Sequence, residues 1–288
     1  MKMFRNIKYF LPTYSQCWVM VFYICAVGGI GVGLAIALAG IVLGFNIQDL
    51  NPLVSYIAPM VPVFAYILFK GNEAAAAKAL PAIPLSNFNP GKASPMAVVL
   101  LVAVSTVAAM IVTEPLSLVF PMPEAIKEVY RKMLSDTFWT TLSVAVAAPL
   151  IEEFLLRGVM LRGMLEHISP AKAILWSAFF FALIHMNLSQ AIGAFIIGIF
   201  IGWIYYRSGS LWLAILIHFI NNGLSTLFTI MYPENIEMSL MDLIIEKYNT
   251  ATYITLYIVS ALVLGAIIRY LHKNLNNEQK QETISIQI

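Results

Sequence analysis

Charged residues are scarce in this sequence: only 11% of its 288 residues are Asp, Glu, Lys or Arg, whereas 60% are hydrophobic. A soluble domain of this length does not need so large an apolar fraction to fill its core. The formal net charge is only +2, and no Lys-rich or Arg-rich tract is present that could follow a phosphate backbone. The composition therefore excludes a nucleic-acid partner and predicts a multi-pass integral membrane protein whose main surroundings are the lipid bilayer.

Cysteine is almost absent, with two residues, Cys17 and Cys25, on one apolar segment. Eight residues of helix separate them by about 12 Å, which is too far for a disulfide bond. No disulfide framework and no cysteine metal cluster is expected. The apolar run at 17–45 follows a basic N-terminal segment but is much longer than the roughly 7 to 15 residues of a signal-peptide core, so we expect it to stay as the first span.

The hydrophobic runs are long enough to cross a bilayer, which needs about 20 residues of helix. They predict an all-α bundle of about eight transmembrane helices, with the pair between 172 and 206 the least clearly divided. Pro59 and Pro62 interrupt the second span. The expected spans are 17–45, 52–70, 95–120, 138–161, 172–188, 190–206, 211–231 and 251–271.

The 17 basic residues divide unevenly between the two sides that eight spans create. With the N-terminus inside, only Lys127, Arg131, Lys132 and Lys247 fall in outer segments. Positively charged loops are retained on the cytoplasmic side during insertion. The distribution therefore predicts that both termini are cytoplasmic.

Three charged residues lie inside the fourth span, in the stretch VAVAAPLIEEFLLRGVMLRG at 144–163. Unpaired charges at this depth cost several kcal/mol, so intramembrane Glu and Arg mark either a structural network or a functional site. Arg157 is four residues after Glu153, the favourable order for an ion pair on one helix face. Neighbouring side chains diverge by about 100°, so we expect Glu152 and Glu153 to face different partners, with Glu152 lacking a local counter-ion.

Two later helices add polar residues at helical spacing. His185 follows Phe181 by four residues on the fifth span, and Asn222 follows His218 by four residues on the seventh. Counted from the nearest cytoplasmic basic residue at 1.5 Å per residue, Glu152, His185 and His218 lie at depths of roughly 15, 20 and 16 Å. The three sites are therefore expected to meet near the middle of the membrane.

Such a cluster contains what hydrolysis by water requires. A glutamate in an apolar pocket and a nearby histidine can share a proton and so deprotonate water, while His218 and Asn222 can offer two N–H donors to an oxyanion. No serine-nucleophile motif surrounds the site, and both cysteines are on the first span. Zinc stays open, because a carboxylate and two imidazoles could bind it, although the H-E-x-x-H signature is absent.

The ordered motifs E-E-x-x-x-R at 152–157, F-x-x-x-H at 181–185 and H-x-x-x-N at 218–222 resemble the CPBP family, which comprises CAAX prenyl endopeptidases and bacteriocin-processing and self-immunity proteins. The resemblance covers about residues 138–231. It implies a glutamate-type intramembrane endopeptidase that needs no metal cofactor. In that mechanism Glu152 and His185 activate water, His218 and Asn222 form the oxyanion hole, and the supporting residues are Glu153, Arg157 and Phe181.

With this resemblance, the chain divides into three parts. Residues 1–137 hold three N-terminal spans and an amphipathic helix in which Ile126, Val129, Tyr130 and Met133 share one face. That helix lies in the outer interface or caps the bundle. Residues 138–231 form the catalytic core, and residues 232–288 hold an outer loop, the last span and a cytoplasmic tail.

Two other functions remain as alternatives. An ion-coupled transporter also uses intramembrane Glu, Arg and His, but many such folds have paired repeats with broken helices, and no second interruption matches Pro59 and Pro62. The second alternative is a non-catalytic immunity or scaffold member of the same family. The substrate is expected to be a membrane-associated peptide or protein, and the compact chain favours a bacterial plasma membrane. The sequence determines neither the cleavage site, nor prenylation of the substrate, nor the oligomeric state.

Overall fold

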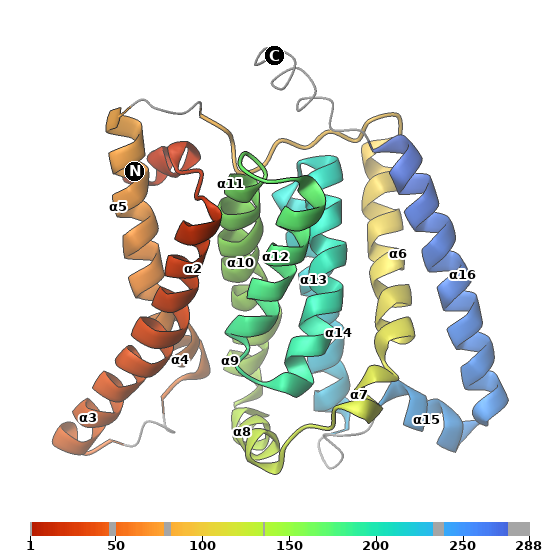
Figure 1. Cartoon of the computed structure of the whole chain (residues 1–288). Helices are drawn as coiled ribbons and strands as arrows, with labels where there is room; N and C mark the ends of the chain where they lie inside the picture. The colour runs from red at the N-terminus through yellow and green to blue at the C-terminus, as the bar shows by residue number, and fades with distance from the viewer. Residues whose placement is uncertain (1, 46–49, 78–81, 135, 233–238, 276–288) are drawn as a thin grey trace.

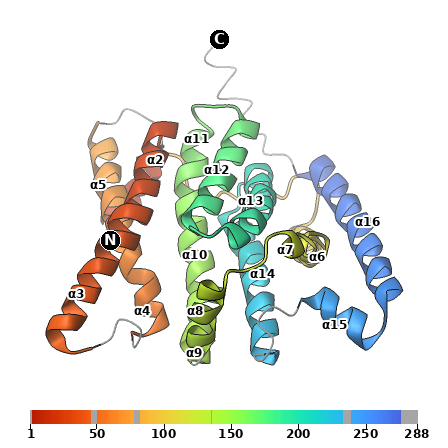
Figure 2. The same cartoon turned by 60° about the horizontal axis from the view of Figure 1, so that its bottom comes forward.

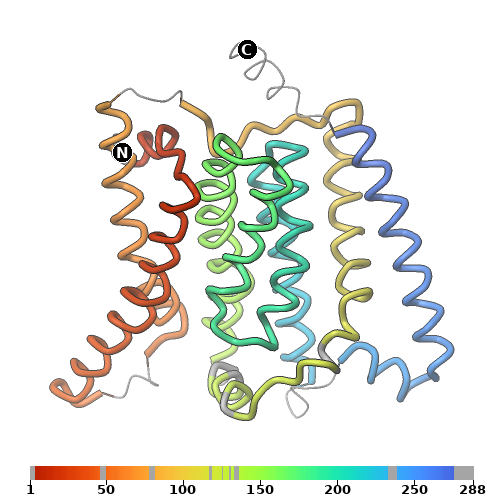
Figure 3. The backbone as a smooth tube through the Cα atoms, in the orientation of Figure 1, coloured from red at the N-terminus to blue at the C-terminus, as the bar shows by residue number. Residues whose placement is uncertain are grey.

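A computed structural model describes residues 2–45, 50–77, 82–134, 136–232 and 239–275. Among these residues every regular element is a helix, which confirms the predicted all-α class. Consecutive long helices alternate in direction, and the first helix and the end of the last one lie at the same end of the bundle (Figure 3). The predicted tail at 276–288 lies outside the described residues.

The N-terminal helices form two arms that pack on each other: the first arm is Tyr14–Leu43 and the second arm is Pro52–Ala77. Thr13 caps the first arm through a capping box with Gln16, and Asn51 caps the second, which begins with Pro52. Pro59 falls in a short stretch with the tighter turns of a 3₁₀-helix and Pro62 lies within α5, so the predicted interruption is only a local tightening of a run that stays helical from Pro52 to Ala77. The elements are α1 (Lys2–Arg5), η1 (Asn6–Tyr9), α2 (Tyr14–Phe22), η2 (Tyr23–Val32), α3 (Gly33–Leu43), α4 (Pro52–Ile57), η4 (Ala58–Met60) and α5 (Val61–Ala77).

The rest of the chain continues the bundle. Ser94 caps α6 and Ser210 caps α14, while Gly209, in the left-handed region at φ 67°, ends α13. The elements are α6 (Pro95–Thr113), α7 (Leu116–Val119), α8 (Glu124–Leu134), α9 (Thr137–Thr141), η5 (Leu142–Ala147), α10 (Ala148–Glu153), η6 (Phe154–Leu161), α11 (Arg162–Met164), α12 (Pro170–Ile184), α13 (Leu188–Ser208), α14 (Leu211–Met231), α15 (Leu240–Lys247) and α16 (Thr250–Asn274).

The helices from α9 to α14 occupy the centre of the molecule. Helices α2 to α5 lie on one side of them, and α6 and α16 on the other (Figures 1 and 2). One apolar cluster joins η6 and α12 to the N-terminal arms, and a second joins α6, α13, α14 and α16. The central helices are therefore shielded on both sides.

Within the part of the chain that the structure describes, six helices are long and apolar enough to cross a membrane. They are Tyr14–Leu43, Pro52–Ala77, Pro95–Thr113, Leu188–Ser208, Leu211–Met231 and Thr250–Asn274. The other two expected spans are helical: one is the charged run from α9 to α11, and the other is α12, whose 15 residues extend about 22 Å, less than the bilayer core. A multi-pass membrane protein is therefore supported, while the count of eight, the orientation and the three-part division stay predictions.

The boundary between the fifth and sixth predicted spans was wrong. The sequence placed His185 inside a span at 172–188, but α12 ends at Ile184 and His185 is its C-terminal cap. Met186 takes a positive φ of 48°, which turns the chain so that α13 begins at Leu188. The two helices pack along each other as separate elements.

Arg162 joins the N-terminal segment to the central helices. Its side chain is buried, and its guanidinium donates to the backbone carbonyls of Ile7 at 3.0 Å, Phe10 at 2.8 Å and Lys8 at 3.2 Å, and also to that of Ile83. A guanidinium has five N–H donors in a planar fork, which suits several carbonyls at once. Arg162 is thus a structural link between the N-terminal segment and the centre of the bundle.

The predicted amphipathic helix exists as α8 at one end of the bundle (Figure 1). Its charges are not all on a solvated face: Lys127 is buried and pairs with Glu124 at 2.7 Å. Ile126 is half-buried and Val129 is exposed, whereas the side chains of Tyr130 and Met133 lie outside the described residues.

Candidate active site

The helical run from α9 to α11 carries the charged residues through the centre of the bundle. Two stretches, η5 and η6, have the wide turns of a π-helix and flank α10, which ends with Glu152 and Glu153. Wide turns change the direction in which successive side chains point and recur at functional sites. Both glutamates are buried, at 8% and 0% exposure.

Glu153 and Arg157 form the predicted ion pair. Arg157 Nη1 lies 2.8 Å from Glu153 Oε1, and neither side chain is exposed. The guanidinium also donates through Nη2 to the Gly198 carbonyl at 2.9 Å, and its Cζ lies 4.9 Å from the centroid of the Phe181 ring. Arg157 thus ties three helices together by an ion pair, a hydrogen bond and a cation–π contact.

His218 lies between the two glutamates. Its Nδ1 is 2.8 Å from Glu153 Oε1, and its Nε2 is 3.9 Å from Glu152 Oε2. The expectation that the glutamates must face different partners was therefore wrong. The two nitrogens of one imidazole point in different directions, so a single histidine reaches carboxylates that diverge from their own helix.

The contacts of His218 indicate which of its ring nitrogens carries a hydrogen. Glu153 already accepts from Arg157, and as a carboxylate it can only accept, so His218 Nδ1 carries the hydrogen. In the doubly protonated form, Nε2–H faces Glu152. Two carboxylates, one guanidinium and one imidazolium then balance to zero net charge within the buried cluster, which lowers the cost of burying them.

Phe181 separates the two histidines. Its ring centroid lies 5.0 Å from that of His185 and 5.2 Å from that of His218, with edge-to-face geometry in both cases. His185 Nδ1 is 2.7 Å from the Phe181 carbonyl oxygen, which can only accept, so Nδ1 carries the hydrogen and Nε2 is left as the basic nitrogen. Among the described residues, no hydrogen bond or ion pair joins His185 to Glu152.

Asn222 lies one turn beyond His218 on α14 and packs against η5. Its Nδ2 donates to the Val144 carbonyl at 2.9 Å, and its Oδ1 accepts from Asn221 at 3.2 Å. An amide nitrogen has two hydrogens, so one N–H remains beside the bond to Val144. Asn222 is thus oriented by the helical run that carries Glu152, and among the described residues no hydrogen bond joins it to either glutamate.

Glu152 has a partner that the sequence analysis missed. Tyr56 Oη, on α4, donates to Glu152 Oε1 at 2.9 Å. A tyrosine in an apolar segment has no spacing pattern that links it to a glutamate 96 residues later. Only the packing of the second arm on the centre reveals this contact.

The candidate metal donors are not arranged around one point. Among the described residues, no group of three or more His, Cys, Asp or Glu side chains is placed to hold a metal ion. One nitrogen of His218 is bonded to Glu153, and the other is 3.9 Å from Glu152, whereas zinc ligands about 2 Å from one ion lie roughly 3.2 to 3.5 Å from each other. As they lie in this structure, the described residues do not form the zinc site that the sequence left open, and metal independence stays a prediction.

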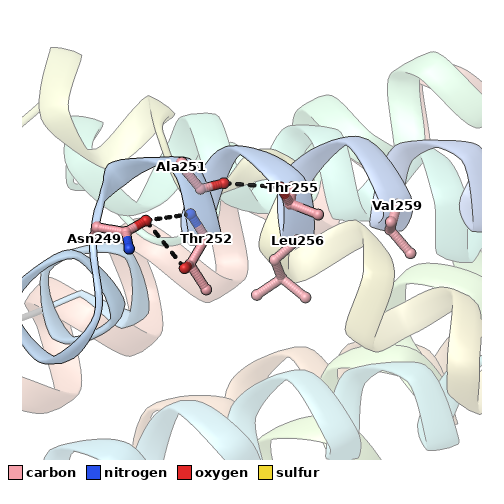
Figure 4. A pocket seen from close by; sticks show the side chains of 6 residues that line it. All are labelled: Asn249, Ala251, Thr252, Thr255, Leu256 and Val259. Carbon is pink, nitrogen blue, oxygen red and sulfur yellow. Dashed lines mark hydrogen bonds between the residues drawn. The ribbon is translucent and has the colours of Figure 1, made fainter.

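A shallow hollow lies along α16, away from these residues (Figure 4). Its polar groups are satisfied within the helix: Asn249 Oδ1 accepts from the Thr252 N–H at 2.9 Å and from the Thr252 hydroxyl at 3.1 Å, and the Thr255 hydroxyl donates to the Ala251 carbonyl at 2.8 Å. Leu256 also lines it, and none of the predicted site residues does. We assign no chemistry to it.

Gly198 allows α13 to approach α12 closely enough for its carbonyl to reach Arg157. A Cβ at Gly198 would lie 3.1 Å from Phe181 Cδ1 and 3.2 Å from Ala178 Cα, closer than side-chain carbons normally approach. We expect Gly198→Ala to lower the free energy of unfolding by about 1–3 kcal/mol, because added volume in a packed core forces neighbours apart. Thermal unfolding in one detergent would measure this loss.

The matched control is Gly193→Ala on the same helix, where no heavy atom lies within 4 Å of the new Cβ. This change should leave stability unchanged or raise it by up to about 1 kcal/mol, because alanine favours a helix more than glycine does. Equal unfolding temperatures for the two variants would contradict the close approach of α12 and α13.

Comparison with known families identifies the segment that holds these residues. Residues 134–224 match the Rce1-like family, described as type II CAAX prenyl endopeptidases, which confirms the resemblance inferred from the motifs. The matched segment contains the predicted site residues Glu152, Glu153, Arg157, Phe181, His185, His218 and Asn222, whereas Tyr56 lies outside it. No curated protein and no solved structure gives a match to the chain. The chain thus carries, at residues 134–224, a segment that matches the Rce1-like family of type II CAAX prenyl endopeptidases.

Proposed function

We propose that this protein is an intramembrane endopeptidase in which Glu152, with His185, activates a water molecule without a metal ion. The observation that carries the proposal is the placement of His218 between two buried carboxylates, with Nδ1 on Glu153 and Nε2 facing Glu152 across 3.9 Å. This arrangement gives Glu152 a different environment from Glu153. Glu153 is bound to Arg157 and His218, whereas Glu152 has one oxygen without a hydrogen bond to a side chain among the described residues.

The reaction follows from these roles. Glu152 takes a proton from water as the oxygen attacks the scissile carbonyl carbon, so that a C–O bond forms and the carbonyl becomes an oxyanion. The C–N bond then breaks, and Glu152 returns the proton to the leaving nitrogen. His185, whose Nε2 is the basic nitrogen, shares this proton transfer.

His218 and Asn222 are proposed to stabilise the oxyanion. Nε2–H of a doubly protonated His218 and the second N–H of Asn222 are donors on one face of α14, one turn apart. Each is held by another contact: Glu153 orients the imidazole, and the Val144 carbonyl orients the amide. Donors that are fixed before the reaction stabilise a developing charge without reorganising.

The proposed substrate is a membrane-associated peptide or protein that ends in a CAAX-type sequence. Membrane proteomics of the native host, carrying either the wild-type protein or Glu152→Gln, tests it without assuming a substrate. A precursor that persists only with Glu152→Gln supports the proposal, and the terminus of its product defines the cleavage site. Identical proteomes would contradict proteolysis and favour a non-catalytic scaffold or immunity role.

Metal independence has its own test. Purified protein is expected to contain well below one equivalent of zinc by elemental analysis, and chelators are expected to leave turnover unchanged, because Glu152 rather than a metal-bound hydroxide supplies the base. Adding calcium and magnesium together with the same concentration of chelator controls for effects of divalent-ion removal on the membrane. Stoichiometric zinc, with activity lost on chelation and restored by adding zinc, would overturn the glutamate mechanism and leave the protease proposal intact.

We also propose that the protein lies in a bacterial plasma membrane with both termini on the cytoplasmic side. The excess of Lys and Arg at one end of the bundle supports this orientation, and α1 and the end of α16 lie at that same end (Figure 1). A fluorescent protein fused after Ile288 should therefore fluoresce, whereas alkaline phosphatase fused there should be inactive. The opposite pattern would place the C-terminus outside and contradict the assignment.

A further inference from the structure

The second N-terminal arm supplies a side chain to the candidate site from outside the segment that matches the family. Tyr56 Oη donates to Glu152 Oε1 at 2.9 Å, and Tyr56 lies 78 residues before position 134, where the match begins. Tyr56 is half-buried, whereas Glu152 is only 8% exposed. A hydrogen bond to a buried carboxylate is charge-assisted and directional, so it restricts how the carboxylate rotates.

Two further contacts fix the arm just after Tyr56. Gly28 of η2 touches the backbone of η4, since a Cβ at Gly28 would lie only 2.0 Å from the Pro59 carbonyl oxygen. Further along the arm, the rings of Phe64 and Phe154 stack with centroids 5.5 Å apart and an angle of 12° between their planes. The tyrosine is therefore held in place by backbone and ring packing rather than by its hydroxyl alone.

The contact distinguishes the two oxygens of Glu152. Tyr56 occupies Oε1, while Oε2 faces His218 Nε2 at 3.9 Å. That separation exceeds a hydrogen bond, but one oxygen atom about 2.8 Å from each group could contact both with an angle near 90° between them. Among the described residues, the polar and charged groups that interact with Glu152 are Tyr56 on α4, His218 on α14, and Arg157 on its own helical run, where Glu153 is its neighbour in sequence.

We propose that Tyr56 is a positioning residue for Glu152, holding Oε1 so that Oε2 is directed at the reacting water. This inference rests on the proposed function, because it assigns the base oxygen of that reaction. It also means that the active site is complete only when the second N-terminal arm is packed against the centre. Tyr56 itself contacts neither water nor substrate in this role.

Tyr56→Phe removes only the hydroxyl and so tests whether Tyr56 positions Glu152. The probes are two internally quenched peptides that end in Cys-aliphatic-aliphatic-Met, one S-farnesylated and one with a free thiol, cleaved by the full-length protein in detergent. We expect kcat to fall roughly 10- to 100-fold with KM changed less than about twofold, because misorientation of a catalytic group affects the chemical step. Introducing 4-aminophenylalanine at position 56 restores an N–H donor on the same ring and should recover most of kcat.

Tyr66→Phe is the matched control on the same arm. Its ring stacks on Tyr23 with centroids 5.1 Å apart, and among the described residues its hydroxyl has no hydrogen-bond partner, so kcat should be unchanged. Wild-type kcat in Tyr56→Phe would overturn the proposal. Loss of kcat without rescue by 4-aminophenylalanine would assign the effect to ring packing and would also overturn it.

A double-mutant cycle separates this inference from the proposed function. Tyr56→Phe and Glu152→Met should each lower Tm, and the double variant should lower it by clearly less than the sum, because the two side chains share one contact. Additive Tm changes would show that the hydrogen bond is absent. If the wild-type protein cleaves neither peptide but the cycle shows coupling, the proposed function fails, and Tyr56 is reduced to a structural contact of Glu152.

Discussion

Glu152→Gln is expected to lower turnover by at least about 10²–10⁴-fold while the protein stays folded, because glutamine has nearly the same shape but cannot accept a proton. Tyr56 can still donate to the amide oxygen, so the packing of the second N-terminal arm is preserved. Cleavage of the farnesylated, internally quenched peptide measures turnover. Gel filtration and Tm in the same detergent measure folding.

Asn222→Ala provides the graded comparison. It removes one proposed oxyanion donor and should cost roughly 10²–10³ in rate, with activity still detectable. Its bond to the Val144 carbonyl is also lost, so Tm must be measured alongside. If Glu152→Gln retains turnover within a few-fold of wild type, Glu152 is not the base.

Arg157→Ala is expected to act on the fold rather than only on the chemistry. Arg157 is fully buried, and its loss leaves Glu153 with His218 as its remaining ionic partner. Removing one member of a buried ion pair costs about 3–5 kcal/mol, a large share of the roughly 5–15 kcal/mol that stabilises a typical protein. The yield of monodisperse protein and the Tm should both fall sharply, in contrast to Glu152→Gln.

The double variant Glu153→Gln/Arg157→Met separates charge from packing. It removes both members of the pair, keeps an acceptor for His218 Nδ1 and retains a side chain of similar length over Phe181. We expect it to be more stable than Arg157→Ala, since it also removes the buried carboxylate that Arg157→Ala deprives of its guanidinium. A double variant as unstable as Arg157→Ala would assign the loss to the contacts of Arg157 with Gly198 and Phe181. Equal loss of fold in Glu152→Gln and Arg157→Ala would indicate a purely structural cluster.

Local sequence patterns were enough to identify the helical run, the ion pair and the family. The spacing from Glu153 to Arg157 places both on one face of a helix whatever surrounds them, so the pair follows from a rule that holds within one element. The same is true of the bond from His185 Nδ1 to the carbonyl four residues earlier. The length of α12 was less predictable, because Met186 turns the chain after Ile184 through a positive φ, and no residue pattern in the sequence predicts a positive φ there.

Residue order alone was enough to place this chain in a membrane and to locate the predicted site residues on three hydrophobic segments, because the cost of placing charge in lipid acts on each segment separately. The position of His218 between both glutamates depends on how α14 is rotated against α10, so it became known only from the packing of the helices. The same packing also decided that Tyr56, 96 residues earlier, holds one oxygen of Glu152. Contacts of this kind arise from the packing of whole helices, such as the close approach at Gly28 and Pro59, and side-chain order along one helix does not contain them.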